Sequence, residues 1–75
     1  MSILSDKVLK LTIDYIGPSS LAFLERQTKH HLNGLEFASL EKAHLPELAK
    51  WVGISAGLLI DKKRAAELSE KIKKL

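Results

Sequence analysis

Hydrophobic residues recur every three or four positions in four segments of the chain. This spacing predicts helices over residues 5–16, 20–32, 45–60 and 62–74. The residues between them are mixed in character, and we expect a short connector at residues 34–44 with one helical turn after Ser39. No segment of any length alternates apolar and polar residues with the two-residue period of a strand. The pattern therefore predicts an all-α, compact four-helix domain that takes up residues 1–75 as a single unit.

The first two predicted helices are bounded by residues that cap or stop helices. Ser5 or Asp6 can cap the first helix. Gly17 can end that helix and Pro18 cannot continue its hydrogen bonds, so we expect a tight corner with Gly17 at positive φ. A serine caps the second helix, whose expected buried stripe is Leu21, Leu24, Thr28, His31 and Leu32.

The second half of the chain carries equally clear helix signals. Pro46 suits the first turn of the third helix, and Asp61 can cap the fourth. The third helix has apolar residues at helical spacing up to Ile60, and Gly53 and Gly57 are expected to be points of close packing within it. On the fourth helix, the surface ion pairs expected at a spacing of four are Glu67–Lys71 and Glu70–Lys74.

Composition narrows the class of protein. A chain of 75 residues has room for one small core, and the absence of cysteine removes disulfides and thiolate sites. No apolar run approaches the ~18 residues of a membrane span, and the first residues do not resemble a signal peptide. We therefore expect a soluble, cytoplasmic protein. The net charge of +3 is concentrated in residues 61–75, where acidic residues are interspersed, so a nucleic-acid partner is possible without being required.

Side chains that could support catalysis or bind a metal are sparse. His30 and His31 are adjacent, and on a helix they point about 100° apart, which does not favour a shared metal ion. The acidic residues stand singly, and no glycine-rich phosphate loop or nucleophile motif occurs. We therefore expect no enzymatic activity, no cofactor and no metal site, with Arg26, Lys29 and His30 on a solvated face and His31 half-buried.

The stretch "LAKWVGISAG", Leu48 to Gly57, has the spacing of a DNA-binding helix-turn-helix. In that motif Ala49 and Gly53 would allow two helices to approach at the turn, and Ser55 would begin a recognition helix. Base recognition needs arginine, lysine, asparagine or glutamine on that helix, whereas this segment offers serine, alanine, glycine, isoleucine and aspartate. We favour one continuous helix here, with Ala56 and Gly57 packed against another helix, and keep DNA binding through residues 45–64 as the alternative.

Large apolar residues outside the main stripes suggest a surface for a protein partner. Phe23, Trp51 and Ile54 lie off the stripes of their helices, and Phe37 lies in the connector, where it is expected to fill the core. The sequence leaves open whether the off-stripe residues are core or interface. If exposed, they would form a partner-binding patch with Arg26 and Lys50 at its polar rim, and a homodimer would cover it without a second gene product.

The stretch "DYIGPSSLAFLERQ" resembles the helix–Ile-Gly-Pro–helix opening of a small helical domain found at the ends of bacterial serine/threonine kinases and other signalling proteins. The matching residues are Tyr15, Ile16, Gly17 and Pro18, and the later "LPELAKWV" and "AAELSEKI" are similar to that domain's closing helices. Ser19 and Ser20 depart from the apolar or small residues usual there. The resemblance implies a non-catalytic interaction or regulatory module. The residues themselves favour the same function, a non-enzymatic interaction module that self-associates.

Overall fold

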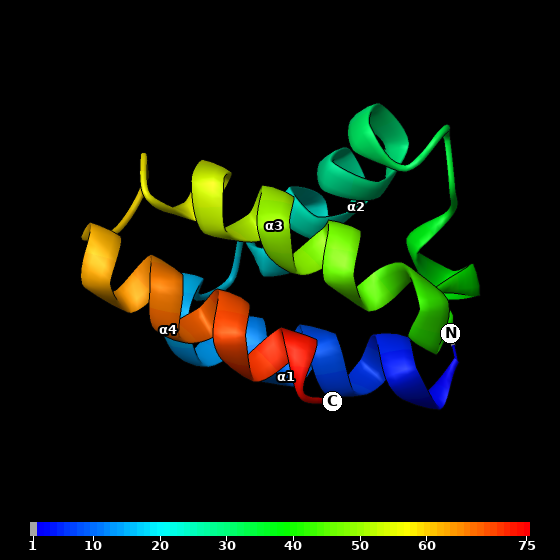
Figure 1. Cartoon of the computed structure of the whole chain (residues 1–75), viewed down its shortest axis with the longest axis horizontal. Helices are drawn as coiled ribbons and strands as arrows, with labels where there is room; N and C mark the ends of the chain where they lie inside the picture. Colours follow the sequence, from blue (N-terminus) through cyan, green and yellow to red (C-terminus); the bar gives the residue numbers. More distant parts are fainter. Residues whose placement is uncertain (1) are drawn as a thin grey trace.

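The computed structural model describes residues 2–75, and all four predicted helices are present (Figure 1). The α-helices are α1 (Ile3–Ile16), α2 (Ser20–His31), α3 (Leu45–Ala56) and α4 (Lys62–Lys73). The connector holds two single 3₁₀ turns, η1 (Phe37–Ser39) and η2 (Lys42–His44), where the sequence predicted only one turn after Ser39. Residues 2–75 contain no strand. The prediction of an all-α four-helix domain is confirmed.

The helices form a closed ring of contacts around one core. α1 packs against α2 and α4, and α3 packs against the same two helices. α3 and α4 run antiparallel side by side, while α2 rises from behind α3 and α1 runs partly behind α4 (Figure 1). The connector returns the chain to the start of α1, where the Ser2 N–H donates to the Ala38 carbonyl at 3.2 Å. The N-terminus of α1 is therefore fixed by a segment much later in the chain.

The core draws apolar side chains from all four α-helices and from the connector. Its buried hydrophobic members are Val8, Phe23, Leu24, Phe37, Leu40, Leu45, Leu48, Ala49, Val52, Ala56, Ala65, Leu68 and Ile72. Phe37 fills the core from the connector, as the sequence predicted. The buried serine and threonine hydroxyls donate to carbonyls three or four residues earlier in the chain, as Thr12 Oγ1 does to the Val8 carbonyl at 2.7 Å. Among the described residues no buried side-chain nitrogen or oxygen lacks a partner, so burial of these polar groups is compensated.

The predicted start of α1 is wrong by two residues. Ser2, and not Ser5 or Asp6, is the N-cap, because its hydroxyl accepts a hydrogen bond from the Ser5 N–H at 3.0 Å. Ser5 lies within the first turn and is fully buried, with its own hydroxyl donating to the Ser2 carbonyl at 2.9 Å. Either serine could cap a helix; the contact of Ser2 with the connector decides between them.

The buried face of α2 is rotated from the predicted stripe. Phe23 is 2% exposed and belongs to the core, whereas Leu21 remains 38% exposed. His31, predicted to be half-buried, is exposed, with its ring stacked on Trp51 at 3.9 Å between centroids. The rotation follows from the ring of helices, since α2 must face α1 and α3 simultaneously and a single narrow stripe cannot do so.

α3 ends four residues earlier than the spacing predicts. After Ala56 the chain forms tight turns in which the N–H groups of Leu58 and Leu59 donate to carbonyls three residues back, at 3.1 and 2.9 Å. Asp61 then caps α4 as predicted, with Oδ1 accepting from the Arg64 N–H at 2.8 Å. A helix continuing to residue 60 would carry the chain past the point where α4 must reverse along α3.

Among the smaller predictions about the second half, one ion pair needs correction. Ala56 is fully buried as expected, and Gly57 is half-buried at the end of α3, where a Cβ would lie 3.3 Å from the Ile54 carbonyl oxygen of its own helix and 3.9 Å from Lys62 Cγ of α4. Glu67 and Lys71 pair at 3.7 Å as predicted. Glu70 instead pairs with Lys73 at 3.8 Å, because α4 ends at Lys73 and Lys74 lies beyond its last turn.

The corner between α1 and α2 depends on the backbone of Gly17. Its φ of 87° and ψ of −149° confirm the predicted positive φ, in a region that is essentially restricted to glycine. The Gly17 N–H donates to the Ile13 carbonyl at 2.9 Å, and the Gly17 carbonyl accepts from the Ser20 hydroxyl at 2.7 Å. This one residue therefore ends α1 and starts α2, with Pro18 preventing continuation of the first helix.

We expect Gly17→Val to destabilise the domain by about 1–3 kcal/mol, because an L side chain resists this backbone region. Nothing lies within 4 Å of a Cβ built at Gly17, so the penalty arises from φ and ψ and not from a clash. D-alanine at position 17, introduced by chemical synthesis, provides the matched control. Thermal unfolding should show a lower Tm for the valine variant and an unchanged or higher Tm for D-alanine; a similar loss in both would contradict the backbone explanation.

Candidate interaction surface

A shallow groove runs along the outer seam between α3 and α4. It encloses about 500 Å³ and is lined by Lys50, Gly53, Ile54, Gly57, Leu58, Lys62, Ala66, Ser69 and Glu70. These residues face away from the core stripes of the two helices. Residues 62 to 70 of α4 span about 12 Å at 1.5 Å per residue, so the groove is long enough for two turns of another helix.

The floor of the groove consists of small residues because the two helices approach closely there. A Cβ built at Gly53 would lie only 3.1 Å from Ser69 Cβ, so α4 packs directly against the α3 backbone. The Ser69 hydroxyl donates to the Ala49 carbonyl at 2.7 Å across the same seam. Ala66 continues the floor toward the turn. With only glycine, alanine and serine at its base, the groove has space for a large side chain supplied from outside.

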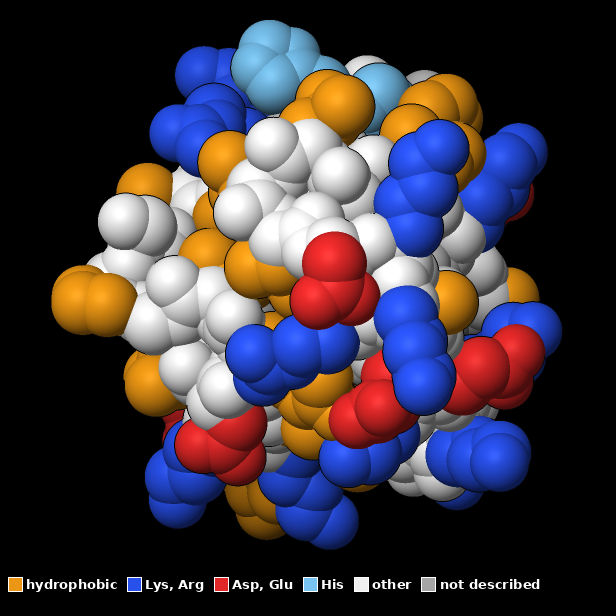
Figure 2. Space-filling view, turned by 90° about the vertical axis from the view of Figure 1, so that its left-hand side faces the viewer, with side chains coloured by type: hydrophobic (Ala, Val, Ile, Leu, Met, Phe, Trp, Pro, Cys, Tyr) orange, Lys and Arg blue, Asp and Glu red, His pale blue; other side chains and the backbone are white. Residues whose placement is uncertain are grey.

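Large aliphatic side chains stand exposed at the turn end of this groove. Leu58 is 87% exposed, Leu59 60% and Ile54 55%. Leu58 and Leu59 are in these positions because α3 ends at Ala56 and the following turns project them outward. Figure 2 looks onto this end of the molecule, where hydrophobic side chains are exposed among both positively and negatively charged ones. Burying one such side chain contributes about 1.5–3 kcal/mol, so a molecule that covered this surface would bind with a favourable free energy from apolar burial.

Charged side chains border the groove at both ends. Lys62 lies beside the turn, where its Cγ is 3.9 Å from a Cβ built at Gly57. Lys50 and Glu70 border the far end. The Lys50 ammonium lies 5.2 Å from the centre of the Trp51 ring, and Glu70 pairs with Lys73. The groove thus has an apolar centre with a polar rim, the usual anatomy of a protein interface.

The five predicted partner-binding residues divide among several places. Lys50 and Ile54 line the α3–α4 groove. Phe23 is in the core, so its predicted place in an exposed patch is wrong. Trp51 is half-buried against His31, and its Nε1–H donates to Glu47 at 3.0 Å. Arg26 lies on α2, away from the groove.

Arg26 borders a second, wider depression between α2 and the connector. It encloses about 760 Å³, and its lining includes Glu25, Arg26, Lys29 and Glu36. Its two acidic and two basic side chains balance, and its one large aromatic, Phe37, is only 3% exposed and belongs to the core. This depression therefore offers neither a net charge nor an exposed anchor, and the α3–α4 groove is the stronger candidate.

The aliphatic pair Leu58–Leu59 is a feature that helical spacing did not predict as part of a site. The spacing assigned both residues to a longer third helix, with Leu59 on the buried stripe. The available signal was their position two and three residues before the Asp61 cap, because a chain that must reverse within a few residues cannot keep every apolar side chain inside.

The segment with helix-turn-helix spacing forms a different arrangement. Gly53 lies inside α3 and not in a turn, and no helix begins at Ser55. The Ser55 hydroxyl instead donates to Gln27 Oε1 on α2 at 3.0 Å. α3 and α4 lie antiparallel side by side (Figure 1), whereas the helices of a helix-turn-helix cross at about 90–120°.

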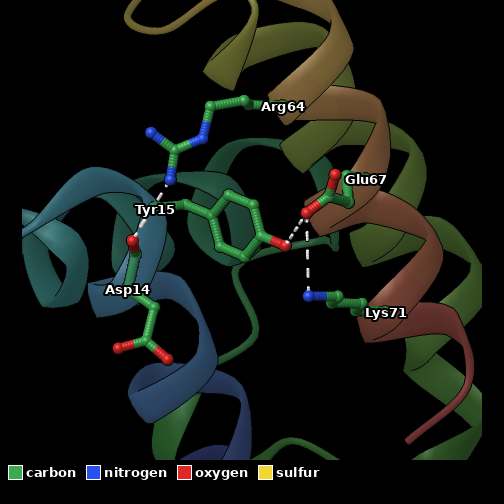
Figure 3. A network of polar contacts seen from close by, with 5 residues as sticks. All are labelled: Asp14, Tyr15, Arg64, Glu67 and Lys71. Atoms are coloured by element: carbon green, nitrogen blue, oxygen red, sulfur yellow. Dashed lines mark hydrogen bonds and ion pairs between the residues drawn. The ribbon is translucent and has the colours of Figure 1, made fainter.

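A cluster of polar side chains joins α1 to α4 on another face (Figure 3). The Tyr15 hydroxyl donates to Glu67 Oε1 at 2.6 Å, and Lys71 approaches the same oxygen at 3.7 Å. The Arg64 guanidinium carbon lies 5.1 Å from the centre of the Tyr15 ring, and its Nη2 donates to the Asp14 carbonyl at 3.4 Å. The hydrogen bond from Tyr15 lowers the pKa of Glu67, with smaller contributions from Lys71 and Arg64. Each of these side chains has a partner within the cluster. The cluster is therefore explained as a structural link between α1 and α4.

Comparison with protein-family models, with curated proteins and with solved structures gives no match to this chain. Among the described residues no helix is long and apolar enough to span a bilayer.

The Tyr15–Glu67 bond makes a testable contribution to stability as a function of pH. A carboxyl whose pKa is lowered by folding stabilises the fold fully above its ordinary pKa of 4.5, and that contribution is lost as the pH falls through the lowered value. We expect Tyr15→Phe to lower the Tm by about 1–3 °C at pH 7, the size typical of an exposed polar contact, and the difference to shrink below about pH 4.

Glu67→Gln provides the control for this measurement. In that background the carboxylate is absent, so Tyr15→Phe should shift the Tm by an amount that is constant between pH 3 and pH 7, about the range in which glutamate titrates. If the difference in Tm between wild type and Tyr15→Phe is also constant over this pH range, the hydrogen bond from Tyr15 to the Glu67 carboxylate is contradicted.

Proposed function

We propose that this protein is a non-enzymatic interaction module that docks a helical segment of a protein partner in the α3–α4 groove. The observation that carries the proposal is the juxtaposition of Leu58, 87% exposed, with a floor made of glycine, alanine and serine. An amphipathic helix places apolar side chains along one face and can insert them between two such helices. The length of the groove matches two helical turns.

The electrostatics of the groove suggest which helices it would accept. Its lining carries Lys50, Lys62 and Glu70, and Glu70 already pairs with Lys73. A bound helix with aliphatic residues at positions i, i+3 or i+4, and i+7 would fill the centre. Acidic residues beside that stripe would meet Lys50 and Lys62 at the rim.

DNA binding is the competing proposal, and the positive charge of α4 is its support. The first three residues of α4 are Lys62, Lys63 and Arg64, all exposed. A helix face of this kind would bind phosphates without reading bases, so its affinity would fall steeply with salt. Binding of a mixed-sequence duplex, followed by fluorescence anisotropy at two salt concentrations, separates this from docking in an apolar groove, which is much less sensitive to salt.

Selection from a library of helix-forming peptides displayed on phage tests the docking proposal. We expect enriched peptides to carry the i, i+3/i+4, i+7 aliphatic stripe. Their Kd should rise about tenfold or more in Leu58→Ser, because the lost burial is worth at least ~1.5 kcal/mol. Ala66→Trp should abolish binding by filling the floor, since Ala66 is exposed and its replacement leaves the core intact.

Ile3→Ser is the matched control for this test. Ile3 is 78% exposed on α1, so the substitution removes a comparable aliphatic side chain at a distance from the groove. Its Kd for the selected peptides should equal that of the wild type. Peptides that bind Leu58→Ser and Ala66→Trp as tightly as wild type, or a selection that enriches none, would contradict the proposal.

A further inference from the structure

The α3–α4 groove carries a protruding side chain and a recess on the same surface. Leu58 projects at the turn end, and the recess between Gly53, Ala66 and Ser69 lies along the seam from it. A surface that contains both a projection and its receptor can pair with a copy of itself, because in a two-fold dimer each feature meets its counterpart twice. Ile54 lies between the Leu58 projection and the recess, and its side chain is 55% exposed. It would therefore lie where the two copies meet.

We propose that the groove is occupied by a second copy of this chain, packed about a two-fold axis with the two grooves antiparallel. This inference rests on the proposed function, since it names the partner of the same groove. In this arrangement α3 lies over the partner's α3 and α4 over the partner's α4. The axis crosses α4 at Ala66, the midpoint of the groove.

The positions of the residues along the α3–α4 seam determine which residues of the two copies would meet. Gly57 lies beside Lys62 at the turn end, and Gly53 lies beside Ser69 farther along, because a Cβ built at each glycine would be 3.9 Å and 3.1 Å from these side chains. Reversing the groove about Ala66 therefore brings Leu58 of one copy over the Gly53 recess of the other. The alternative, with grooves parallel, would place Leu58 over Lys62 and leave the two recesses facing each other. Only the antiparallel arrangement fills the recess.

The charges on α4 fit the same arrangement. Lys62 and Glu70 are four residues before and four residues after Ala66, so reversal places Lys62 of each copy opposite Glu70 of the other. Lys62 forms no ion pair within the described residues, and Glu70 has one exposed pair, with Lys73. Lys50 is on α3, where its aliphatic stem would meet the other copy's Leu58 while its ammonium lies over Trp51. The antiparallel dimer thus gains two ion pairs without opposing lysines.

Sedimentation velocity of the full chain from about 10 to 500 µM, a range suited to small interfaces, tests self-association. The wild type should shift from monomer to dimer with concentration. Leu58→Ser should raise the dimer Kd at least about tenfold, because the side chain is lost at two symmetric places. Ile3→Ser should leave the Kd unchanged. A wild type that stays monomeric, or that forms higher oligomers, would overturn the two-fold arrangement.

Charge reversal then tests the register. Lys62→Glu and Glu70→Lys should each weaken the dimer about fivefold or more, because both symmetric pairs become repulsive. An equimolar mixture of the two variants restores opposite charges at both contacts, so it should form a heterodimer with near wild-type Kd. Lys63→Glu, an exposed neighbour that does not line the groove, should have little effect. A mixture that associates no better than its components would overturn the inference.

Failure of this inference is distinguishable from failure of the proposed function. Selected peptides that bind the wild-type groove while the protein remains monomeric would leave the docking function standing and eliminate the second copy as its occupant. A dimer unaffected by Leu58→Ser and by both charge reversals would place self-association on another surface and overturn the inference.

Discussion

The contact between Gly53 and Ser69 is the constraint on which the rest of the structure depends. Because Gly53 has no side chain, α4 approaches the α3 backbone closely enough for the Ser69 hydroxyl to donate to the Ala49 carbonyl at 2.7 Å. This contact fixes the separation and the register of the antiparallel pair. The register in turn directs Val52 of α3 and Leu68 of α4 into the core, where both are fully buried.

The candidate surface arises from the same constraint. Small residues that allow two helices to approach also leave a shallow recess on the outside of the seam. The short connection that reverses the chain ends α3 at Ala56 and exposes Leu58 beside that recess. The fold therefore creates the recess and the projection together, without a separate structural element for binding. This shared origin is the physical reason to consider both as parts of one interface.

The remaining helices complete the core without using the exposed aliphatic residues. Gly17 sets the corner that folds α2 back along α1, and Tyr15 links α1 to α4 through Glu67. Phe23 and Phe37 supply the large side chains of the interior. Because every buried side-chain nitrogen and oxygen of the described residues has a hydrogen-bond partner, the interior of the monomer needs no polar contact from a second chain. Leu58 is thus free to contribute to association without being needed for folding.

The sequence by itself determined the class, the number of helices and the corner at Gly17, because these depend on local periodicity and on backbone conformations that single residues favour. Tertiary structure decided what depends on neighbours in space. Helical spacing could not show that Phe23 would be buried and Leu21 exposed, since α2 faces two helices at once. Nor could it show that Leu58 would be exposed, because the early end of α3 follows from the need to reverse and pack α4 against Gly53.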